Sequence, residues 1–381
     1  MTRSAGPRFV ATELRPEELA LQAEVRAFLA QELPRGSYRP GLGFMAEADK
    51  DFSRKLGARG WLGMALPKAY GGGERSAVER FVVTEELLAW GAPVGHHWVA
   101  DRQSGSTIAG FGTEEQKQRF LPGICSGELG FSIGMSEPGA GSDLAGLRTT
   151  AHRVEGGWRV EGTKVWTTGA HRTDWMITLC RTSEESDRRH GLTQLLVDMR
   201  SPGLTVNPIP FLDGTADFNE VVLDDVFVPD DLVLGEVGRG WAQNTSELAF
   251  ERGGPDRYLS TYVVVEQWLR EAGDLDDAAL GFLGRVTASW WGFRQLSLAS
   301  ARSIDEGRSP VVEAALVKEL GTRFEQDVVE ALQHLVDVEP SPQSPSLFVR
   351  LLSEAVLTGP SFTIRGGTVE VLRSVVAKGL S

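Results

Sequence analysis

The sequence predicts an α+β protein in three parts: an N-terminal α-helical domain over residues 1–127, a middle antiparallel β-domain over 128–236 and a C-terminal domain like a four-helix bundle over 237–381. Two changes of pattern predict this order. Apolar residues recur at helical spacing in the first third, short β-branched and aromatic segments fill the middle, and the helical spacing then returns. The length of 381 residues exceeds the usual size of one compact domain, which agrees with several packed units.

The first third contains three predicted helices. Apolar residues recur at helical spacing over residues 16–34, where Pro34 ends the pattern, and again over 78–90. Thr113 is followed three residues later by Gln116, which is a capping-box arrangement. This pair predicts the start of a third helix.

The middle of the chain has the pattern of β-strands. Its segments are short, rich in β-branched and aromatic residues, and separated by clusters of Gly, Pro, Asp and Ser, which favours an antiparallel sheet or a small barrel. The predicted strands lie within residues 153–168, 174–182, 192–199, 204–209 and 218–229.

The last third is predicted to be mostly helical. Long stretches of helical periodicity cover residues 243–271, 276–305, 309–337, 347–357 and the region from about 368 onward. We expect the Gly-Gly-Pro sequence at 253–255 to kink the first of these helices, because proline cannot donate the backbone hydrogen bond that a helix interior needs.

Composition limits the classes of function. The net charge of −13 disfavours nonspecific binding to nucleic acid. No apolar run approaches the roughly 18 to 20 residues of a membrane span, and no signal-peptide pattern is visible, so we expect a cytoplasmic protein without a membrane partner. Cys125 and Cys180 are the only cysteines and lack metal-ligand spacing, so we expect two core positions and no metal site.

A glycine-rich segment, SEPGAGSD at residues 136–143, is the first candidate for a functional loop. Leu144 stands where a dinucleotide-binding GxGxxG motif needs its third glycine, and the lysine of a Walker loop is missing. The glycines allow backbone amides to approach a flat or anionic group closely, while Ser136 and Ser142 add hydroxyl groups. Taken alone, the segment is more typical of a β-turn that binds no ligand.

The loop belongs to a series of motifs that follow one another along the chain. FSIGMSEPGAGSD at 131–143 is followed by GTKVWTTGAHRTDWMI at 162–177, FNEVVLDDVFVPDDLVLGEVGRGW at 218–241 and RGGTVEVLRSVVAKGL at 365–380. In this order and with these separations, the motifs resemble the acyl-CoA dehydrogenase family over nearly the whole chain. The resemblance implies that family's fold, an FAD cofactor, an acyl-CoA substrate and a dehydrogenation next to the thioester.

The resemblance also implies which residues hold the flavin. Family members place a hydroxyl group at the position of Ser136 near the pyrimidine edge of the ring, and the serine matching Ser142 near both the flavin and the pantetheine arm. Trp166 would pack beside the ring, with Thr168 near N5, the atom that receives the hydride. Taken alone, Trp166 is typical of an aromatic side chain in a sheet core. The implied cofactor-binding residues are Phe131, Met135, Ser136, Gly141, Ser142, Trp166, Thr167, Thr168, Thr368 and Glu370.

The family's reaction needs one carboxylate that faces the α-carbon of the thioester. Many family members carry it just before a C-terminal Gly-Thr pair, but Gly366 occupies that position here. A second branch, which includes isovaleryl-CoA dehydrogenase, carries the base on the first long helix of the C-terminal domain, immediately before an arginine. Glu251 followed by Arg252 matches that position, and Glu247, one helical turn earlier, is the competing candidate. The implied substrate-binding residues are Ser142, Phe250 and Arg252.

The sequence departs from the family pattern where subunits meet. Ordinary homotetrameric members carry an Arg-x-x-Phe-Gly stretch and a Gln-x-x-Gly-Gly stretch, which reach the adenosine and pyrophosphate of a neighbour's FAD. Here residues 269–293 are acidic and shortened, and residues 332–346 lack the second motif. We therefore expect a hetero-oligomer in which a paralogous dehydrogenase subunit completes the cofactor site. A homo-oligomer with an altered FAD contact is the alternative.

The resemblance further implies an electron-transfer flavoprotein as the electron acceptor. Two alternatives remain open at the level of sequence. Besides an active dehydrogenase, the chain could be a noncatalytic or half-site partner subunit of a heteromeric acyl-CoA dehydrogenase, or a flavin oxidase or monooxygenase on the same fold.

Overall fold

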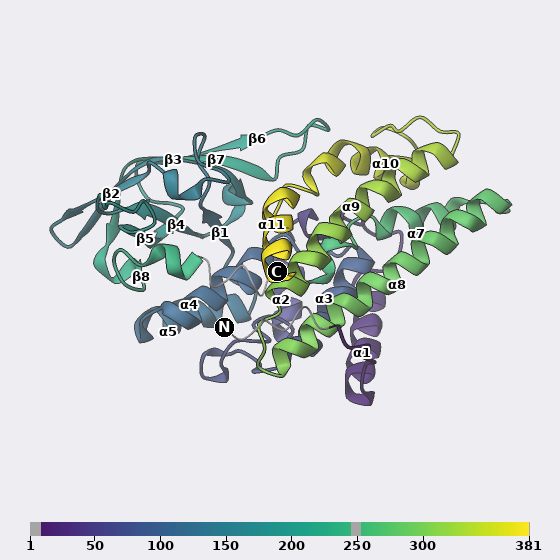
Figure 1. Cartoon of the computed structure of the whole chain (residues 1–381), viewed down its shortest axis with the longest axis horizontal. Helices are drawn as coiled ribbons and strands as arrows, with labels where there is room; N and C mark the ends of the chain where they lie inside the picture. The colour runs from purple at the N-terminus through teal and green to yellow at the C-terminus, as the bar shows by residue number, and fades with distance from the viewer. Residues whose placement is uncertain (1–8, 245–252, 381) are drawn as a thin grey trace. The chain divides into compact units, whose positions relative to one another are not determined.

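The computed structural model describes residues 9–244 and 253–380 (Figure 1). Contacts divide the chain into two compact units, each assembled from separated segments. The helical unit comprises the described residues of Met1–Ala46, Ser76–Pro93 and Ala249–Ser381, and the sheet unit those of Glu47–Arg75 and Val94–Leu248. The domain boundaries at 127 and 236 stay predictions.

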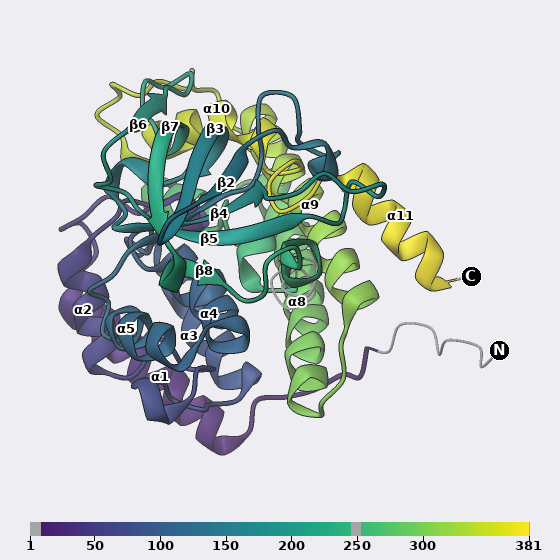
Figure 2. The same cartoon turned by 90° about the vertical axis from the view of Figure 1, so that its left-hand side faces the viewer.

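One mixed sheet forms the centre of the sheet unit (Figure 2). In the described part of this unit it has eight strands, with β1 paired to β4 and the others in the order β6-β7-β3-β2-β4-β5-β8. The strands are β1 (Phe131–Gly134), β2 (Thr150–Val154), β3 (Gly157–Thr168), β4 (Trp175–Arg181), β5 (Leu192–Asp198), β6 (Leu204–Ile209), β7 (Phe218–Pro229) and β8 (Val233–Leu234).

The predicted antiparallel β-domain is confirmed, with one addition. Neighbouring strands such as β3 and β7 or β4 and β5 run antiparallel, whereas β1 and β2 each pair with β4 in parallel. Nearly every side chain of β4 is buried, as is usual for a strand covered on both faces.

The helices α2 (Lys50–Ala58), α4 (Gly105–Phe111) and α5 (Glu114–Cys125) belong to the sheet unit. The predicted capping box of α5 is confirmed, because Thr113 Oγ1 accepts from the Gln116 amide at 3.2 Å and Gln116 Oε1 accepts from the Thr113 amide at 3.1 Å. Gln116 Nε2 also donates to the carbonyl groups of Asp231 and Val233, at 2.7 and 2.8 Å. The ring of Phe120 on α5 packs edge-on against Trp175 of β4, with centroids 4.9 Å apart.

The helices of the helical unit come from both ends of the chain (Figure 1). They are α1 (Pro16–Glu32), α3 (Ala77–Trp90), α7 (Tyr262–Glu271), α8 (Asp277–Asp305), α9 (Val311–Leu335), α10 (Leu347–Thr358) and α11 (Val369–Leu380). Their bounds confirm the helices predicted at both ends of the chain. Apolar side chains of α7, α8, α9 and α10 share one core, while Arg302 of α8 pairs with Glu18 of α1 at 2.7 Å.

The prediction of a single kinked helix over residues 243–271 is wrong for its described part. Residues 255–257 form a 3₁₀ turn, and α7 begins only at Tyr262. Gly253, Gly254 and Pro255 supply two residues of low helix propensity and one that lacks a backbone donor, so the helix is broken rather than bent.

Cys125 and Cys180 are both buried and unbonded, which confirms their prediction as core positions. Burial raises the pKa of the Cys125 thiol to about 11 and that of Cys180 to about 12. Within the described ranges, no helix is both long enough and apolar enough to cross a membrane.

Candidate functional site

A β-bulge in β3 presents Trp166 to the surface of the sheet unit. Lys164 pairs with Val221 and Thr167 with Asn219, so two residues of β3 lie opposite one residue of β7. Trp166 has a φ of +61°, which is a rare and strained conformation for a bulky side chain. Its side chain is 58% exposed, and its ring meets Phe218 edge-on with centroids 6.0 Å apart. Strain of this kind is concentrated at functional sites.

The glycine-rich loop is hydrogen-bonded to this bulge. Glu137 and Ala140 close the loop through two backbone hydrogen bonds of 2.9 and 3.0 Å, and the Val165 amide donates to the Ser136 carbonyl at 2.9 Å. No heavy atom lies within 4 Å of a Cβ placed on Gly139 or Gly141. The loop therefore offers open backbone next to the strained residue, as close approach of a flat group requires.

A buried ion pair holds the loop against β3. Lys164 Nζ lies 2.8 Å from Glu137 Oε1, with the two side chains 0% and 6% exposed. The same carboxylate accepts from the amides of Arg148 and Thr149, at 2.6 and 2.9 Å. Burial alone would raise the pKa of Glu137, but Lys164 and the two residues that donate to it outweigh burial and lower the pKa below its usual value. Glu137 thus stays ionised and ties three segments together.

A second polar cluster supports the other side of the bulge. Asn219 Nδ2 donates to the Thr167 carbonyl at 3.0 Å, and Asn219 Oδ1 lies 2.9 Å from His171 Nδ1. The Gly169 amide donates to the Asp217 carbonyl at 2.8 Å. The Asp217 carboxylate forms an ion pair with Arg172, and burial raises its pKa although the guanidinium opposes this.

The other cofactor-binding residues predicted in the sheet unit differ in their exposure to solvent. Phe131 is a core residue, 1% exposed, and Thr167 is fully buried, whereas Thr168, Ser136 and Met135 are half-buried. Gly141 and Ser142 lie on the exposed part of the loop. The structure thus brings Ser136, Trp166 and Thr168 to exposed or half-buried positions on and beside the bulge, whereas the ring of Phe131 packs in the core against Phe120 of α5.

Thr368 and Glu370 lie at the start of α11 in the helical unit. Thr368 Oγ1 accepts from the Val371 amide at 3.4 Å. Hydrogen bonds from the Glu370 amide and the Thr368 hydroxyl group lower the pKa of the exposed Glu370 carboxyl group. Both residues cap the helix, and their contact with a cofactor stays a prediction.

The turn before α11 explains why residue 366 is a glycine. Gly366 has a φ of +67°, and a Cβ there would lie 2.9 Å from Nη1 of the buried Arg257. Arg365 in the same turn donates to Glu325 Oε2 at 3.0 Å and to Ser260 Oγ at 2.7 Å, while Lys318 Nζ donates to the Gly367 carbonyl at 2.7 Å. A carboxylate side chain cannot take this position without moving a buried guanidinium.

Four residues of the catalytic hypothesis lie outside the described residues. They are the proposed base Glu251, its competitor Glu247, and the substrate-path residues Phe250 and Arg252.

Sequence reasoning missed the residues that support the bulge. Lys164 and Glu137 lie inside recognised motifs, but a lysine and a glutamate in a sequence are most often exposed, so nothing marked them as a buried pair. Asp217 and Asn219 lie about 50 residues after Trp166. Only the pairing of β3 with β7 reveals that they lie beneath it.

Comparisons with known proteins agree with this geometry. The family model described as the acyl-CoA dehydrogenase N-terminal domain matches residues 15–128, and the model of the middle domain matches 132–226. Acyl-CoA dehydrogenase FadE29 of Mycobacterium tuberculosis is 32% identical over 96% of this chain and 96% of its own length. FadE34 of the same organism is 34% identical over 85% of this chain, which spans only 45% of that longer protein.

Solved structures show the same similarity. The Tcur3481-Tcur3483 steroid ACAD matches with a TM-score of 0.84 at 31% identity, covering 96% of this chain and 97% of that one. The ChsE4-ChsE5 complex from Mycobacterium tuberculosis matches with a TM-score of 0.81 at 28% identity, covering 97% and 98%. The sequence motifs, the fold and these similarities together establish that the chain belongs to the acyl-CoA dehydrogenase family of oxidoreductases.

Proposed function

We propose that this chain holds the isoalloxazine ring of FAD against its sheet unit and takes part in α,β-dehydrogenation of an acyl-CoA thioester. The observation that carries the proposal is the strained, exposed Trp166 at φ +61°, hydrogen-bonded through its neighbour Val165 to the glycine-rich loop. The buried ion pair between Lys164 and Glu137 fixes this arrangement. It helps to hold Trp166 in a backbone conformation that a bulky residue rarely adopts.

The residues around the bulge fit a large flat ring. Trp166 offers an exposed aromatic face, and Gly139 and Gly141 leave the loop free of side-chain obstruction. The half-buried Ser136 and Thr168 add hydroxyl groups for the polar edge of such a ring. These are the parts by which a protein orients a flavin and tunes its electronics.

Glu251 is the proposed catalytic base. Its carboxylate would take the α-proton of the thioester. Its sequence neighbours Phe250 and Arg252 would border the substrate path. FAD, when bound, would accept the β-hydrogen in the form of a hydride. An electron-transfer flavoprotein is the proposed final acceptor.

We also propose that the cofactor site is completed by a paralogous subunit. The connection between α7 and α8 exposes Asp274, Asp276 and Asp277, and Asp276 is engaged in capping α8 through the Ala279 amide at 2.8 Å. An acidic surface of this kind is a poor partner for a pyrophosphate. Two of the similar solved structures carry the names of two different proteins, which supports pairing with a related chain.

The acyl group proposed for the substrate carries a ring system. The Tcur3481-Tcur3483 protein, to which this chain is similar, is a steroid ACAD. Because this chain is 31% identical to that protein over 96% of its length, steroid-ring acyl-CoA esters are the substrate class to test first.

Coexpression tests the proposed function. The chain is purified alone and with a paralogous dehydrogenase subunit, and the flavin absorbance per chain is compared. We expect flavin bands mainly in the copurified complex, and bleaching of those bands when acyl-CoA esters from a panel of linear, branched and steroid-ring substrates are added. Full flavin content in the chain alone would refute the need for a partner, and a flavin-bound complex that no acyl-CoA bleaches would refute the dehydrogenation.

A further inference from the structure

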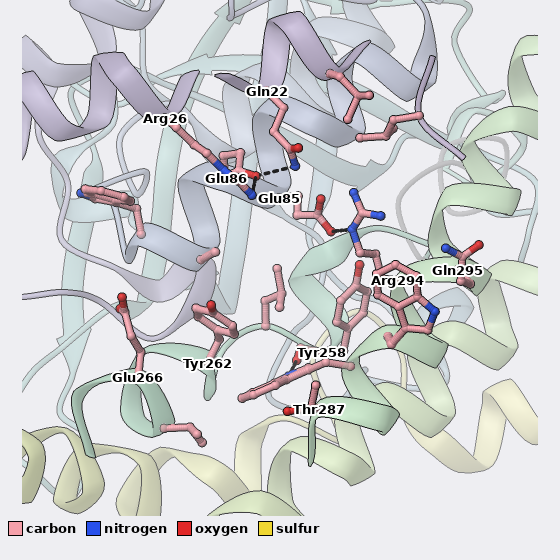
Figure 3. A pocket seen from close by; sticks show the side chains of 18 of the residues that line it. Gln22, Arg26, Glu85, Glu86, Tyr258, Tyr262, Glu266, Thr287, Arg294 and Gln295 are labelled. Atoms are coloured by element: carbon pink, nitrogen blue, oxygen red, sulfur yellow. Dashed lines mark hydrogen bonds and ion pairs between the residues drawn. The ribbon is translucent and has the colours of Figure 1, made fainter. Parts of the chain in front are cut away.

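A large groove lies within the helical unit, lined by the segment before α1 and by α1, α3, α7 and α8 (Figure 3). Its volume is about 1300 Å³, which is ample for a drug-sized molecule. Every residue that lines it belongs to the helical unit. The rim is open and apolar, since Trp291 is 63% exposed and Leu19 is 50% exposed.

Aromatic side chains with fixed orientations line the groove. The rings of Tyr262 and Trp290 lie 5.0 Å apart between centroids. Trp290 Nε1 donates to the Tyr258 carbonyl at 3.0 Å, which fixes the orientation of the indole. The guanidinium of Arg35 lies 4.0 Å above the ring of Trp90. Rigid aromatic faces bind apolar ring systems with little loss of side-chain entropy.

Arg294 gives the groove its open hydrogen-bond donors. Its Nε donates to Glu85 Oε1 at 2.8 Å, and its side chain is 22% exposed. In Figure 3 the two terminal nitrogens of Arg294 lie on the side away from Glu85. Within residues 9–244 and 253–380, no acceptor is found for these two nitrogens.

The other two cations of the lining are already engaged. Arg26 makes two hydrogen bonds of 2.8 Å to Glu86. Arg35 pairs with Glu266 at 2.9 Å. Arg294 therefore keeps both terminal nitrogens available, whereas Arg26 and Arg35 each have a terminal nitrogen engaged with a glutamate.

The charge of the lining disfavours an anionic ligand. Three arginines face four glutamates, namely Glu13, Glu85, Glu86 and Glu266. Burial raises the pKa of Glu85 to about 6, although Arg294 opposes this, so that carboxylate stays mostly ionised at neutral pH. A neutral oxygen acceptor can use the Arg294 donors without adding a further negative charge.

We propose that this groove is a binding site for a neutral, ring-containing ketone or alcohol, whose oxygen accepts from the terminal nitrogens of Arg294 and whose rings lie on Tyr262 and Trp290. The inference does not depend on the proposed flavin chemistry, because its residues lie outside the bulge and the glycine-rich loop.

Calorimetric titration of the full chain with progesterone, a neutral tetracyclic diketone, tests the proposal. We expect one site per chain, with quenching of tryptophan fluorescence on binding. Arg294→Met should weaken binding about 10- to 100-fold, as expected for loss of a hydrogen bond to a charged group. Arg285→Met, the same substitution at an exposed position of α8, should leave the affinity unchanged.

Two further variants keep the test decisive if Arg294→Met does not fold. The double variant Glu85→Gln and Arg294→Met removes both charges together, and Thr287→Trp fills the groove from an exposed position of α8. The double variant should weaken binding of progesterone about 10- to 100-fold, like Arg294→Met, and Thr287→Trp should abolish it. Undetectable binding by the unaltered chain, equal binding by all the variants, or tighter binding of the ring-matched anion deoxycholate below its micellar concentration would each overturn the proposal.

Discussion

Lys164→Met is expected to destabilise the sheet unit by about 3 to 5 kcal/mol, because it leaves the buried Glu137 carboxylate without its counter-ion. The ion pair is 2.8 Å long and excluded from water, so no solvent replaces the missing ammonium group. Urea unfolding followed by tryptophan fluorescence measures the loss. The double variant Glu137→Gln and Lys164→Met should regain part of it, because no unpaired buried charge remains. The recovery is incomplete because the single amide oxygen can accept from only one of the Arg148 and Thr149 amides, which donate to different carboxylate oxygens.

The same loop offers a matched control. Arg188 lies 3.0 Å from Asp143, but the two side chains are 64% and 65% exposed. Arg188→Met should therefore cost less than about 1 kcal/mol. Equal effects of Arg188→Met and Lys164→Met would show that burial does not set the strength of the Glu137 pair.

The effect of Lys164→Met should also depend on pH. The pKa of Glu137 is lowered in the folded chain relative to the usual value of 4.5. Its ionisation therefore contributes stability that is fully present above about pH 4.5 and is lost as the pH falls through the lower, folded pKa. The difference between the unaltered chain and Lys164→Met should shrink as the pH falls, because burial without Lys164 raises the pKa of Glu137 and favours its neutral form.

Glu251→Gln is expected to leave flavin bound to the copurified complex while slowing bleaching by acyl-CoA about 100- to 10,000-fold, the usual contribution of a general base. Glutamine keeps the size and hydrogen-bonding groups of the side chain but cannot accept the α-proton. Stopped-flow measurement of flavin absorbance gives the rate directly.

Glu247→Gln is the control for this assignment, because Glu247 lies one helical turn from Glu251 in the predicted helix. We expect it to bleach at the rate of the unaltered complex. A reversed result, with Glu247→Gln inactive and Glu251→Gln active, would move the base to Glu247. If neither variant loses activity, this predicted helix does not carry the catalytic base.

The sequence predicted most elements because their signals are local. The capping box at Thr113 and the strand segment ending at Thr168 depend on residues a few positions apart. The break at Gly253-Gly254-Pro255 was underestimated, because the apolar residues that follow extend the helical pattern, although Pro255 lacks a backbone donor and the glycines have low helix propensity.

The support of the site was not predictable because it is nonlocal. The strain at Trp166 becomes visible only when Lys164 and Thr167 are matched to Val221 and Asn219 across β3 and β7. Likewise, Gly366 was predicted only as a missing carboxylate, whereas the structure shows the buried Arg257 occupying the space that a side chain would need.

The strained bulge at Trp166 is the proposed contact surface for a flavin ring. Its most direct test is the affinity of the deflavinated, copurified complex for FAD, measured for the unaltered chain and for Trp166→Gly. Glycine adopts the φ of +61° without strain, so the unfolding midpoint should be unchanged or higher.

Loss of the aromatic contact should weaken FAD binding about 3- to 10-fold in Trp166→Gly. Phe227→Ala, which removes a partly exposed ring elsewhere on β7, should not change the affinity. Unchanged FAD affinity in Trp166→Gly would contradict the account.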